Sequence, residues 1–313
     1  MTAPLVSIVV PTLNGAETIM DLLGAIYTQR TSFKFEVVAV DSGSTDATVG
    51  LLLERGGARV LHVTPGSFNH GATRNLAIEA ARGEIVALIV QDAQPASLDW
   101  LERLVQPLRA DPGLAGTYAR QLPRPGASAL TRHYLGHWMA GSGEPRIASL
   151  AGAEELAALA PIERYRRCVF DNVSSAIRRS VWETHPFPVT PIAEDVEWAR
   201  TILLAGYRLA YVPDAVVVHS HERSARYELW RTYLVHQRLR ALFGLRLVPT
   251  PVHVLAGVAR NVVSHLRCVA LEGPVFSPQG GRALALAVAF PLGQYLGALS
   301  ADTGRRLLKP RGV

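Results

Sequence analysis

Cysteine is scarce in this sequence, which has 2 cysteines among 313 residues. Cys168 and Cys268 lie far apart and show none of the close spacings of thiolate metal sites. This scarcity argues against a disulfide framework and favours a reducing compartment. Residues 1–10 also lack a charged segment followed by an apolar one, so we expect no signal peptide. These absences predict a cytoplasmic protein.

The loop after the first apolar run lacks two phosphate-binding patterns. Its sequence, PTLNGAET over residues 11–18, has no GxGxxG fingerprint, which argues against an enzyme that transfers hydride through a dinucleotide. It also lacks the glycine-rich loop with Arg and Lys that the chemistry of a sugar nucleotidyltransferase would need. Both classes of enzyme are therefore disfavoured.

Basic residues are concentrated towards the end of the chain. The formal net charge is +6, and residues 223–313 hold 13 of the 32 Lys and Arg residues but 3 of the 26 Asp and Glu residues. A basic region of this kind could bind nucleic acid or an anionic membrane surface. The region is also apolar and carries no nucleic-acid-binding motif, so we expect a membrane partner and no nucleic acid.

Residues 283–301 form an uncharged stretch of 19 positions near the end of the chain. Pro291 and Gly293 interrupt the stretch, which is unfavourable for a membrane-spanning helix. We expect it to pack at the membrane interface, which would make the protein peripheral on the inner face of the cell membrane. The basic anchors would be Arg305, Arg306, Lys309 and Arg311. A true span, a homo-oligomer contact and core packing are the alternatives.

Apolar, β-branched runs alternate with segments of helical periodicity over about the first 120 residues. Strands are expected at 6–10, 36–40, 59–63 and 84–90, and helices at 16–29, 46–54, 71–81 and 98–109. This βα repetition predicts an α/β fold with a Rossmann-like, mostly parallel central sheet and helices on both faces.

The rest of the chain is less regular before it becomes helical. Proline, glycine and serine punctuate residues 123–167, where we expect an excursion with one small helix near Glu154. Further elements are expected as a strand at 173–177, a helix at 193–204, and short strands at 209–212 and 215–219. From about residue 224 the sequence predicts a C-terminal helical extension.

Polar residues follow several of the predicted strands, where open parallel sheets bind their ligands. These candidate binding residues are Pro11, Thr12, Asn14, Asp41, Ser44, His70, Arg74, Gln91 and Asp92. Asp41 could accept the ring N–H of a pyrimidine, whereas Asp46 is expected to cap a helix. Arg74 lies one turn into a helix that opens at Gly71, so it could reach a diphosphate. His70 could either form a hydrogen bond within its loop or contact the ligand.

Asp92 is a single carboxylate after an aliphatic strand. Its neighbours Gln91 and Ala93 cannot supply a second anionic ligand. One carboxylate suffices for Mg²⁺ when phosphates and water complete the coordination sphere, and the ion would offset charge on a departing diphosphate. A solvated turn is the alternative.

Two other clusters stay open on the residues alone. Glu194, Asp195 and Glu197 begin a predicted helix, where three acids would stabilise the helix dipole without any catalytic role. His219 and His221 share one face of an extended segment and could reach one metal, although such pairs are more often structural.

Seven motifs occur in order across residues 5–245. They are VSIVVPTLNG, VVAVDSGSTDAT, FNHGATRN, LIVQDAQP, YARQLPRP, FDNVSSAIRRSVWE and IAEDVEWARTILLAGYRLAYVPDAVVVHSH. This ordered set resembles the inverting family 2 glycosyltransferases with the glycosyltransferase A fold, and most closely their bacterial rhamnosyltransferase-like branch. The family's usual metal signature has acids at both ends of a three-residue window, whereas the QDA segment here keeps only Asp92.

The resemblance implies a role for several candidates. Asp41 would recognise the nucleotide base, Arg74 would approach the diphosphate, and Asp92 would bind a divalent metal, Mg²⁺ or Mn²⁺. Asp195 would be the general base that deprotonates the attacking hydroxyl. A late histidine would touch the metal or phosphate, and we favour His219 over His221. The acceptor side would be lined by Asp171, Asn172, Glu194 and Trp198.

The resemblance also implies a reaction and a domain organisation. A sugar, expected to be rhamnose, would pass from a dTDP donor, or a UDP donor, to a hydroxyl of a glycan or lipid-linked acceptor. The catalytic domain would span 1–222, with a donor half over about 1–122 and an acceptor half over about 123–222. The basic, apolar composition of residues 223–313 indicates a helical region for membrane association or oligomerisation. A non-catalytic subunit of a glycan-synthesis complex is the alternative, and a sugar nucleotidyltransferase a weaker one.

Overall fold

The computed structural model describes residues 3–54, 57–64, 66 and 68–308. The chain forms two compact units. The first contains Met1–Leu122, Trp138–Leu156 and Arg167–His219, and the second contains Pro123–His137, Ala157–Arg166 and Ser220–Val313. The predicted division into donor and acceptor halves stays a prediction.

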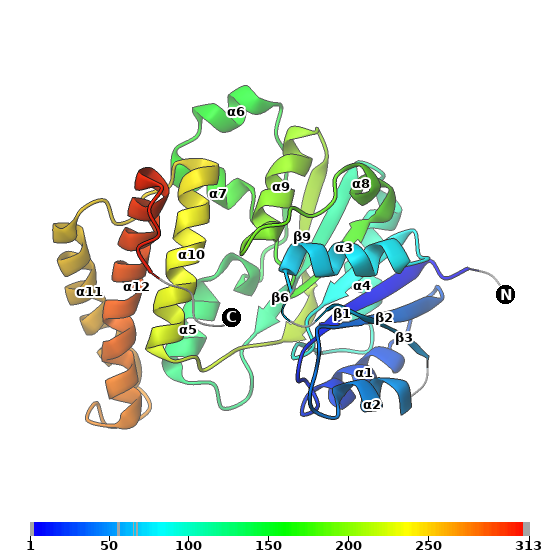
Figure 1. Ribbon diagram of the computed structural model, residues 1–313, viewed down its shortest axis with the longest axis horizontal. Coiled ribbons are helices and arrows are strands. Elements are labelled where there is room, and N and C mark those ends of the chain that lie inside the picture. The colour runs from blue at the N-terminus through cyan, green and yellow to red at the C-terminus, as the bar shows by residue number, and fades with distance from the viewer. Residues whose placement is uncertain (1–2, 55–56, 65, 67, 309–313) are drawn as a thin grey trace. The chain divides into compact units, whose positions relative to one another are not determined.

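The first unit is built on one sheet of nine strands among the described residues, in the order β3-β2-β1-β4-β8-β6-β9-β5, with β7 paired to β9 (Figure 1). The strands are β1 (Val6–Thr12), β2 (Phe35–Asp41), β3 (Ala58–His62), β4 (Ile85–Ile89), β5 (Gln94–Pro95), β6 (Leu114–Leu122), β7 (Arg146–Ala148), β8 (Ser174–Arg178) and β9 (Arg208–Val218). Strands β3, β2, β1 and β4 are parallel, as the βα repetition predicts. Strand β8 runs antiparallel to β4 and β6, so the sheet is mixed beyond β4.

Helices cover both faces of this sheet, which confirms the predicted α/β class (Figure 1). They are α1 (Ile19–Tyr27), α2 (Thr48–Glu54), α3 (His70–Ala80), α4 (Trp100–Ala110), α8 (Arg179–Thr184) and α9 (Glu194–Leu204). Alternate residues of β1 face opposite ways, and Val6, Ile8 and Val10 join the core that α1 and α4 cover. Each such aliphatic side chain contributes about 1.5–3 kcal/mol by leaving water. This packing fixes the strand ends that carry the candidate residues.

Two features of the sheet differ from the sequence-based expectation. The strands expected at 209–212 and 215–219 form one strand, β9, which ends at Val218. The chain bulges within it, where the pairing with β6 shifts between Ala119 and Arg120. Strand β6 itself was not expected, since Gly116, Thr117 and the polar residues after them hide its strand pattern. Both strands matter for the site, because β6 and β9 pair in parallel up to Leu122 and Val218.

The region 123–167 is more regular than expected. It contains α5 (Ala129–His137), the short helix η1 (Met139–Gly141), β7, α6 (Ala153–Ala158) and α7 (Pro161–Arg167). Helix α6 is the small helix expected near Glu154.

The second unit is helical, as predicted, and includes α10 (Ala225–Phe243), α11 (Pro251–Ala270) and α12 (Pro278–Thr303) (Figure 1). Helices α10 and α12 approach closely, because a Cβ on Gly297 would lie 2.3 Å from the carbonyl oxygen of Tyr233. Among the described residues, α12 is the helix long and apolar enough to cross a membrane, by length and composition only, and half of its most apolar window is buried.

Candidate active site

The carboxyl ends of β1, β2 and β4 gather most of the predicted donor-side residues at one edge of the first unit's sheet. These residues are Pro11, Thr12, Asn14, Asp41, Ser44, Gln91 and Asp92. The pairing of Thr12 with Asp41 in the β1–β2 register fixes the two loops that follow as neighbours.

Asp41 ends β2 and shapes the loop after it. Its Oδ2 accepts hydrogen bonds from the backbone N–H groups of Gly43 (3.0 Å) and Ser44 (2.9 Å), and its Oδ1 accepts from the hydroxyls of Ser44 (2.5 Å) and Thr12 (3.3 Å). These four bonds match the acceptor capacity of a carboxylate, and the residue is 1% exposed. Asp41 therefore holds the loop in place, and a direct contact with a nucleotide base stays a prediction.

Asn14, Ser44 and Gln91 brace the loop after β1. Asn14 adopts a φ of 47°, a left-handed conformation that asparagine tolerates, and its N–H donates to Ser44 Oγ (2.8 Å). Gln91 donates to the carbonyl oxygen of Leu13 and accepts from its N–H, both at 2.9 Å. Asp46 accepts from the backbone N–H of Thr48 at the start of α2, which is the capping role expected of it.

The N-terminus of α3 is capped from within the protein. Asn69 Oδ1 accepts from the backbone N–H groups of Gly71 (3.1 Å) and Ala72 (3.0 Å). A Cβ on Gly71 would lie 2.1 Å from the carbonyl oxygen of Pro188, so this segment packs directly on the helix start. The N–H groups expected to attract an anion are thus satisfied by Asn69 in this structure.

Arg74 and Glu194 form a buried ion pair between α3 and α9. Arg74 Nη1 lies 2.8 Å from Glu194 Oε1, and the two side chains are 6% and 7% exposed. Nη1 also donates to the carbonyl oxygen of His70 (3.2 Å). Burial lowers the pKa of His70, the charge of Arg74 lowers it further, and Glu194 opposes both. Arg74 and Glu194 are each other's partners here, so their expected contacts with diphosphate and acceptor stay predictions.

Asp195 is the second residue of α9. Ala193, just before the helix, has φ 61° and ψ 35°, a left-handed conformation that costs a non-glycine residue about 1–2 kcal/mol. Strained backbone of this kind is concentrated at functional sites. Asp195 Oδ1 accepts from the N–H of Val196 (2.8 Å), and Oδ2 from the N–H of Asn172 (3.4 Å).

The environment of Asp195 makes its carboxylate unusually basic. Burial raises the pKa of Asp195 to about 8, and the charges of Glu194 and Asp171 act in the same direction. The N–H of Val196 and the charge of Arg74 oppose the rise. The residue keeps part of its surface open to solvent. A partly accessible carboxylate with a pKa near neutrality is suited to exchange protons with a ligand.

Asp92 and His219 form a pair of possible metal ligands. Asp92 Oδ1 lies 3.7 Å from His219 Nε2, and both side chains are largely buried. Two atoms that bind one ion at about 2.1 Å each lie about 3–4 Å apart, so the pair fits a shared divalent cation. Oxygen and imidazole nitrogen are a suitable donor set for Mn²⁺ or Mg²⁺. His221 follows two residues after His219, so chain connectivity keeps it as a further candidate ligand.

Asp171 lies behind this pair. Its Oδ2 accepts hydrogen bonds from Gln121 Nε2 (2.6 Å) and Trp138 Nε1 (3.1 Å), and its Oδ1 accepts from the N–H of Val173 (3.0 Å). Gln121 Oε1 in turn lies 3.1 Å from His219 Nδ1. The sequence reading gave Gln121 and Trp138 no role, although Gln121 lies within the YARQLPRP motif.

The other two acceptor-side predictions differ in where the structure places them. Asn172 is 2% exposed, and its Nδ2 has no hydrogen-bond partner among the described residues. A buried donor of this kind is costly unless a ligand or water satisfies it. Trp198 is 1% exposed, donates to the carbonyl oxygen of His185 (2.8 Å) and packs on Phe170 and Phe187. Trp198 therefore supports α9 from the core and presents no open surface to an acceptor.

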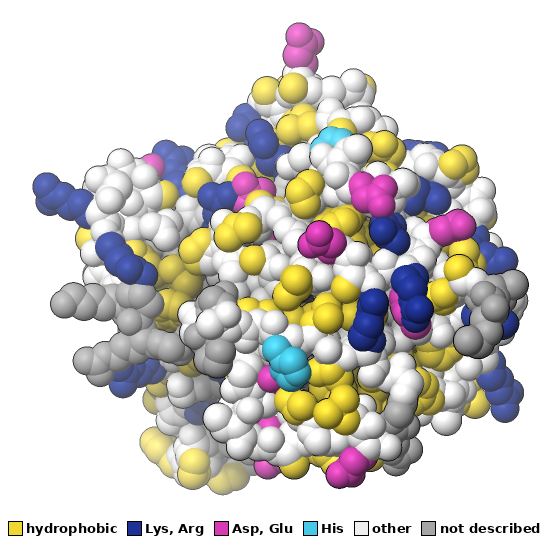
Figure 2. All heavy atoms as spheres, turned by 45° about the vertical axis from the view of Figure 1, so that its right-hand side comes forward, with side chains coloured by type: hydrophobic (Ala, Val, Ile, Leu, Met, Phe, Trp, Pro, Cys, Tyr) yellow, Lys and Arg dark blue, Asp and Glu magenta, His cyan; other side chains and the backbone are white. Residues whose placement is uncertain are grey.

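Charge on the visible surface is mixed. Figure 2 shows one face of the molecule, on which Lys and Arg side chains are scattered and several lie next to Asp or Glu side chains. Among the described residues drawn on this face, the basic side chains form no single broad patch.

Comparison with known proteins adds the family. The family described as "Glycosyl transferase family 2" matches residues 7–151. The O-antigen chain rhamnosyltransferase RfbN of Salmonella typhimurium is 32% identical over 231 residues, which are 73% of this chain and 70% of that protein. The O-antigen chain rhamnosyltransferase WbaN of Salmonella anatum is 30% identical over 233 residues, 74% of this chain and 70% of that protein.

Solved structures support the fold. The mannosyltransferase PcManGT from Pyrobaculum calidifontis, in complex with GDP-Man and Mn²⁺, superposes with a TM-score of 0.61 at 23% identity, covering 98% of this chain and 89% of that one. This likeness confirms the glycosyltransferase A fold. Together with two O-antigen rhamnosyltransferases at 30% identity or more, it shows that the chain belongs to the family 2 glycosyltransferases, in their rhamnosyltransferase-like branch.

Proposed function

We propose that this glycosyltransferase moves rhamnose from dTDP-rhamnose to a hydroxyl of a growing glycan or lipid-linked precursor, with inversion at the anomeric carbon. The observation that carries the proposal is Asp195, a partly accessible carboxylate with a pKa raised to about 8 at the start of α9. The O-antigen rhamnosyltransferases among the relatives support the sugar and the type of acceptor.

Asp195 acts as the general base. The acceptor hydroxyl gives its proton to a carboxylate oxygen of Asp195 while the hydroxyl oxygen attacks the anomeric carbon. The bond between that carbon and the diphosphate oxygen breaks in the same displacement, and its electron pair leaves with the nucleoside diphosphate. Attack from the side opposite the leaving group inverts the configuration. The backbone N–H of Asn172 donates to Asp195 Oδ2 and so helps to orient this carboxylate.

Asp92 and His219 hold the divalent metal, and His221 is a further candidate. A bound Mg²⁺ or Mn²⁺ supplies charge that offsets the negative charge developing on the departing diphosphate. A short path of contacts connects the proposed metal ligands with the proposed base. Asp171 contacts Gln121, the partner of His219, and the next residue, Asn172, contacts Asp195.

The nucleotide lies at the loops after β1 and β2. Asp41 fixes the conformation of its loop, so the base is expected to contact the loop that Asp41 and Ser44 shape. Arg74 contributes mainly through its pair with Glu194, which ties α3 to the helix that carries Asp195.

A sugar-nucleotide panel tests this function. We expect dTDP-rhamnose to be consumed, with dTDP released, when Mn²⁺ or Mg²⁺ is present, and a chelator to lower the rate at least about tenfold. Asp92→Ala should match the chelated wild type, whereas Asp99→Ala, which removes an exposed carboxylate on another loop, should not. If the chelator does not change the rate at which dTDP-rhamnose is consumed, the metal assignment is contradicted. If no sugar nucleotide is consumed, with or without candidate acceptors, the non-catalytic binding subunit becomes the better reading.

We also propose a membrane partner, with α11 rather than α12 as the contacting helix. Helix α12 uses much of its apolar surface inside the second unit, where Pro291 packs on Gly257 of α11. Helix α11 instead exposes the large apolar residues Val252, Leu255 and Val263, and residues 251–271 include no acid. Of the anchors first expected, Arg305 and Arg306 are exposed, whereas Lys309 and Arg311 lie outside the described residues.

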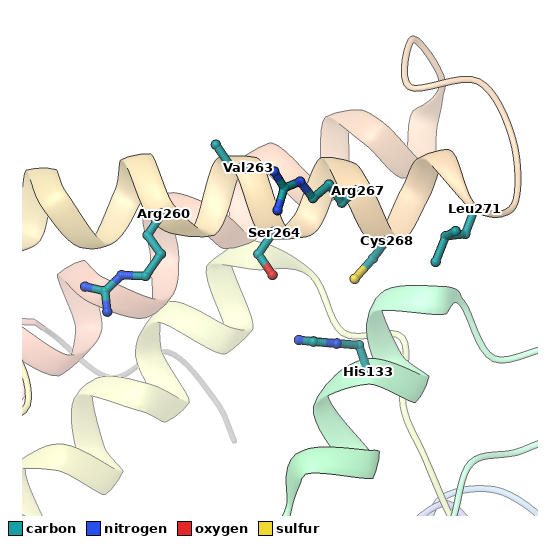
Figure 3. Close-up of a pocket in the computed structure, with 7 residues that line it drawn as sticks. All are labelled: His133, Arg260, Val263, Ser264, Arg267, Cys268 and Leu271. Carbon is teal, nitrogen blue, oxygen red and sulfur yellow. The ribbon is translucent and has the colours of Figure 1, made fainter.

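A cavity on α11 adds basic groups to this face. It has a volume of about 500 Å³ and is lined by His133, Arg260, Val263, Ser264, Arg267, Cys268 and Leu271 (Figure 3). In Figure 3, His133 comes from α5 and lies opposite Ser264 and Cys268 of α11. Arginines beside exposed aliphatic side chains suit the headgroups of an anionic lipid surface.

Vesicle flotation tests the membrane proposal. The wild type should float with vesicles that contain phosphatidylglycerol, and Arg260→Ala/Arg267→Ala should weaken binding about 30-fold, since each arginine contributes about 1 kcal/mol near such a surface. Arg305→Ala/Arg306→Ala removes the same charge from the tail and serves as the control. Equal losses in the two double variants would overturn the choice of α11. A wild type that stays with the soluble fraction and elutes as a dimer would favour the oligomer contact.

A further inference from the structure

A chain of hydrogen-bonded side chains lies behind His219 in the first unit. Trp138 Nε1 and Gln121 Nε2 both donate to Asp171 Oδ2, at 3.1 and 2.6 Å. Gln121 Oε1 contacts His219 Nδ1 at 3.1 Å, and His219 Nε2 lies 3.7 Å from Asp92 Oδ1. The hydrogen bonds thus run from Trp138 to His219, and Asp92, in the loop after β4, lies next to the far side of the His219 ring.

The direction of every bond in this chain follows from Asp171. A carboxylate accepts hydrogen bonds and donates none, so Gln121 must turn its amide nitrogen towards Asp171 and its amide oxygen towards His219. An amide oxygen also only accepts, so the proton in the next bond sits on Nδ1 of His219. A neutral imidazole carries one N–H, and its other nitrogen, Nε2, then bears the lone pair.

We propose that Gln121 and Asp171 are positioning residues that hold His219 with Nδ1 protonated and the Nε2 lone pair directed at the divalent cation it shares with Asp92. The proposal rests on the metal site of the proposed function and deepens it. Asp171, expected on the acceptor side, thereby gains a role on the metal side.

Burial makes this control effective. Gln121 is 5% exposed, and the His219 side chain is 12% exposed, so water has little access to replace these bonds. Partners behind a metal-binding histidine fix its tautomer and ring orientation, and their loss typically lowers metal affinity by about 10–100-fold. Gln121 reaches this position from the end of β6, and His219 directly follows β9, which pairs with β6 in parallel.

Asp171→Asn is the informative variant because it changes the direction of the chain. An asparagine at position 171 can donate to Gln121 Oε1, which lets the Gln121 amide turn over and donate its N–H to His219 Nδ1. His219 would then carry its proton on Nε2, where it blocks metal binding. We expect Mn²⁺ affinity to fall about 10–100-fold, although residue 171 does not touch the ion.

A second substitution should restore the original direction. In Asp171→Asn/Gln121→Glu, the glutamate at position 121 can only accept, so it accepts from both residue 171 and His219 Nδ1. We expect this double variant to recover Mn²⁺ affinity to within about threefold of the wild type, by the same hydrogen-bond rule. Trp138→Phe removes a donor to Asp171 but leaves its carboxylate in place, and it should leave the tautomer of His219 unchanged.

Two measurements on the full-length protein test this proposal. Long-range nitrogen-15 NMR on histidine-labelled, metal-free protein reports which ring nitrogen of His219 carries the proton, with His219→Gln used for assignment. Calorimetry with Mn²⁺ alone reports affinity without any transfer assay. We expect the Nδ1–H form in the wild type, the Nε2–H form in Asp171→Asn, and the Nδ1–H form again in the double variant.

The outcomes separate this proposal from the function on which it rests. Nε2–H in the wild type, or an unchanged tautomer and affinity in Asp171→Asn, would overturn the positioning role even if the metal binds. A wild type that carries the proton on Nδ1 but binds no Mn²⁺ would instead overturn the metal site. The hydrogen bonds from Asp171 to His219 would then have no role in metal binding.

Discussion

Asp195→Asn should lower the rate of sugar transfer by about 10²–10⁴-fold while leaving donor affinity within about twofold of the wild type. The amide keeps the shape of the side chain and can still accept from Val196 N–H, so α9 should begin as before. It cannot take a proton from the acceptor hydroxyl, and the loss therefore falls on kcat. Donor binding is measured separately, by calorimetry with the nucleoside diphosphate.

Glu197→Gln is the matched control for this variant. Glu197 lies in the same first turn of α9, and its loss removes an acid from the helix N-terminus without removing the proposed base. We expect transfer within about twofold of the wild type, because one carboxylate near a helix end contributes about 0.3–1 kcal/mol to the helix. Full transfer by Asp195→Asn, or an equal loss in Glu197→Gln, would reject the assignment of the base.

The raised pKa of Asp195 also makes stability depend on pH. The carboxyl titrates near 3.9 in an unfolded chain and at about 8 in the folded protein, so folding favours its protonated form. The stabilisation from this group is present below about pH 4 and is lost as the pH rises towards 8. Asp195→Asn has no such group, so the Tm of this variant relative to that of the wild type should rise between about pH 4 and pH 8.

Arg74→Met should lower the free energy of unfolding by about 3–5 kcal/mol, the second large effect we expect. It leaves the Glu194 carboxylate buried and unpaired, with 7% of the side chain exposed. Glu194→Gln should cost a similar amount, because it strands the Arg74 guanidinium, whose Nε already has no hydrogen-bond partner among the described residues. Urea unfolding measures each change.

The double variant and an exposed pair supply the controls. Arg74→Met/Glu194→Gln should be less destabilised than the two single losses added together, because neither charge is then left alone. Arg103→Met breaks an exposed pair with Asp99, where both side chains are more than 40% exposed, and should cost about 1 kcal/mol or less. A loss below about 1 kcal/mol in Arg74→Met would contradict the structural role of the buried pair.

The sequence alone predicted the parallel half of the sheet and the polar residues at the carboxyl ends of its strands. Strand β4 was recognisable because Ile85–Ile89 is wholly aliphatic, and Asp92 stood out as the charge beyond it. The resemblance to the family identified Asp195 as the base. The local sequence alone suggested only that Asp195 stabilises the helix dipole. The apolar pattern of a strand was missing where small and polar residues form one, as in β6. The position of Gln121 at the end of β6 was therefore not predicted.

Side-chain partnerships were beyond the reach of the sequence. Arg74 and Glu194 are 120 residues apart, and nothing in either motif indicates that they pair with each other before they meet a ligand. Trp198 follows the base in the motif, yet helix geometry turns it into the core, where it packs on Phe170. Asp41 was recognisable as a strand-end acid, but three of its four hydrogen bonds depend on the backbone turn at Gly43 and Ser44.

The pH dependence of kcat/KM for the acceptor, compared between the wild type and Asp195→Asn, tests the central claim most directly. If Asp195 takes the proton from the acceptor, the wild-type value should rise about tenfold per pH unit below its pKa and level off above about pH 8. The variant should show a low value without that rise. The same rise in both proteins would contradict the account, because another group would then be the base.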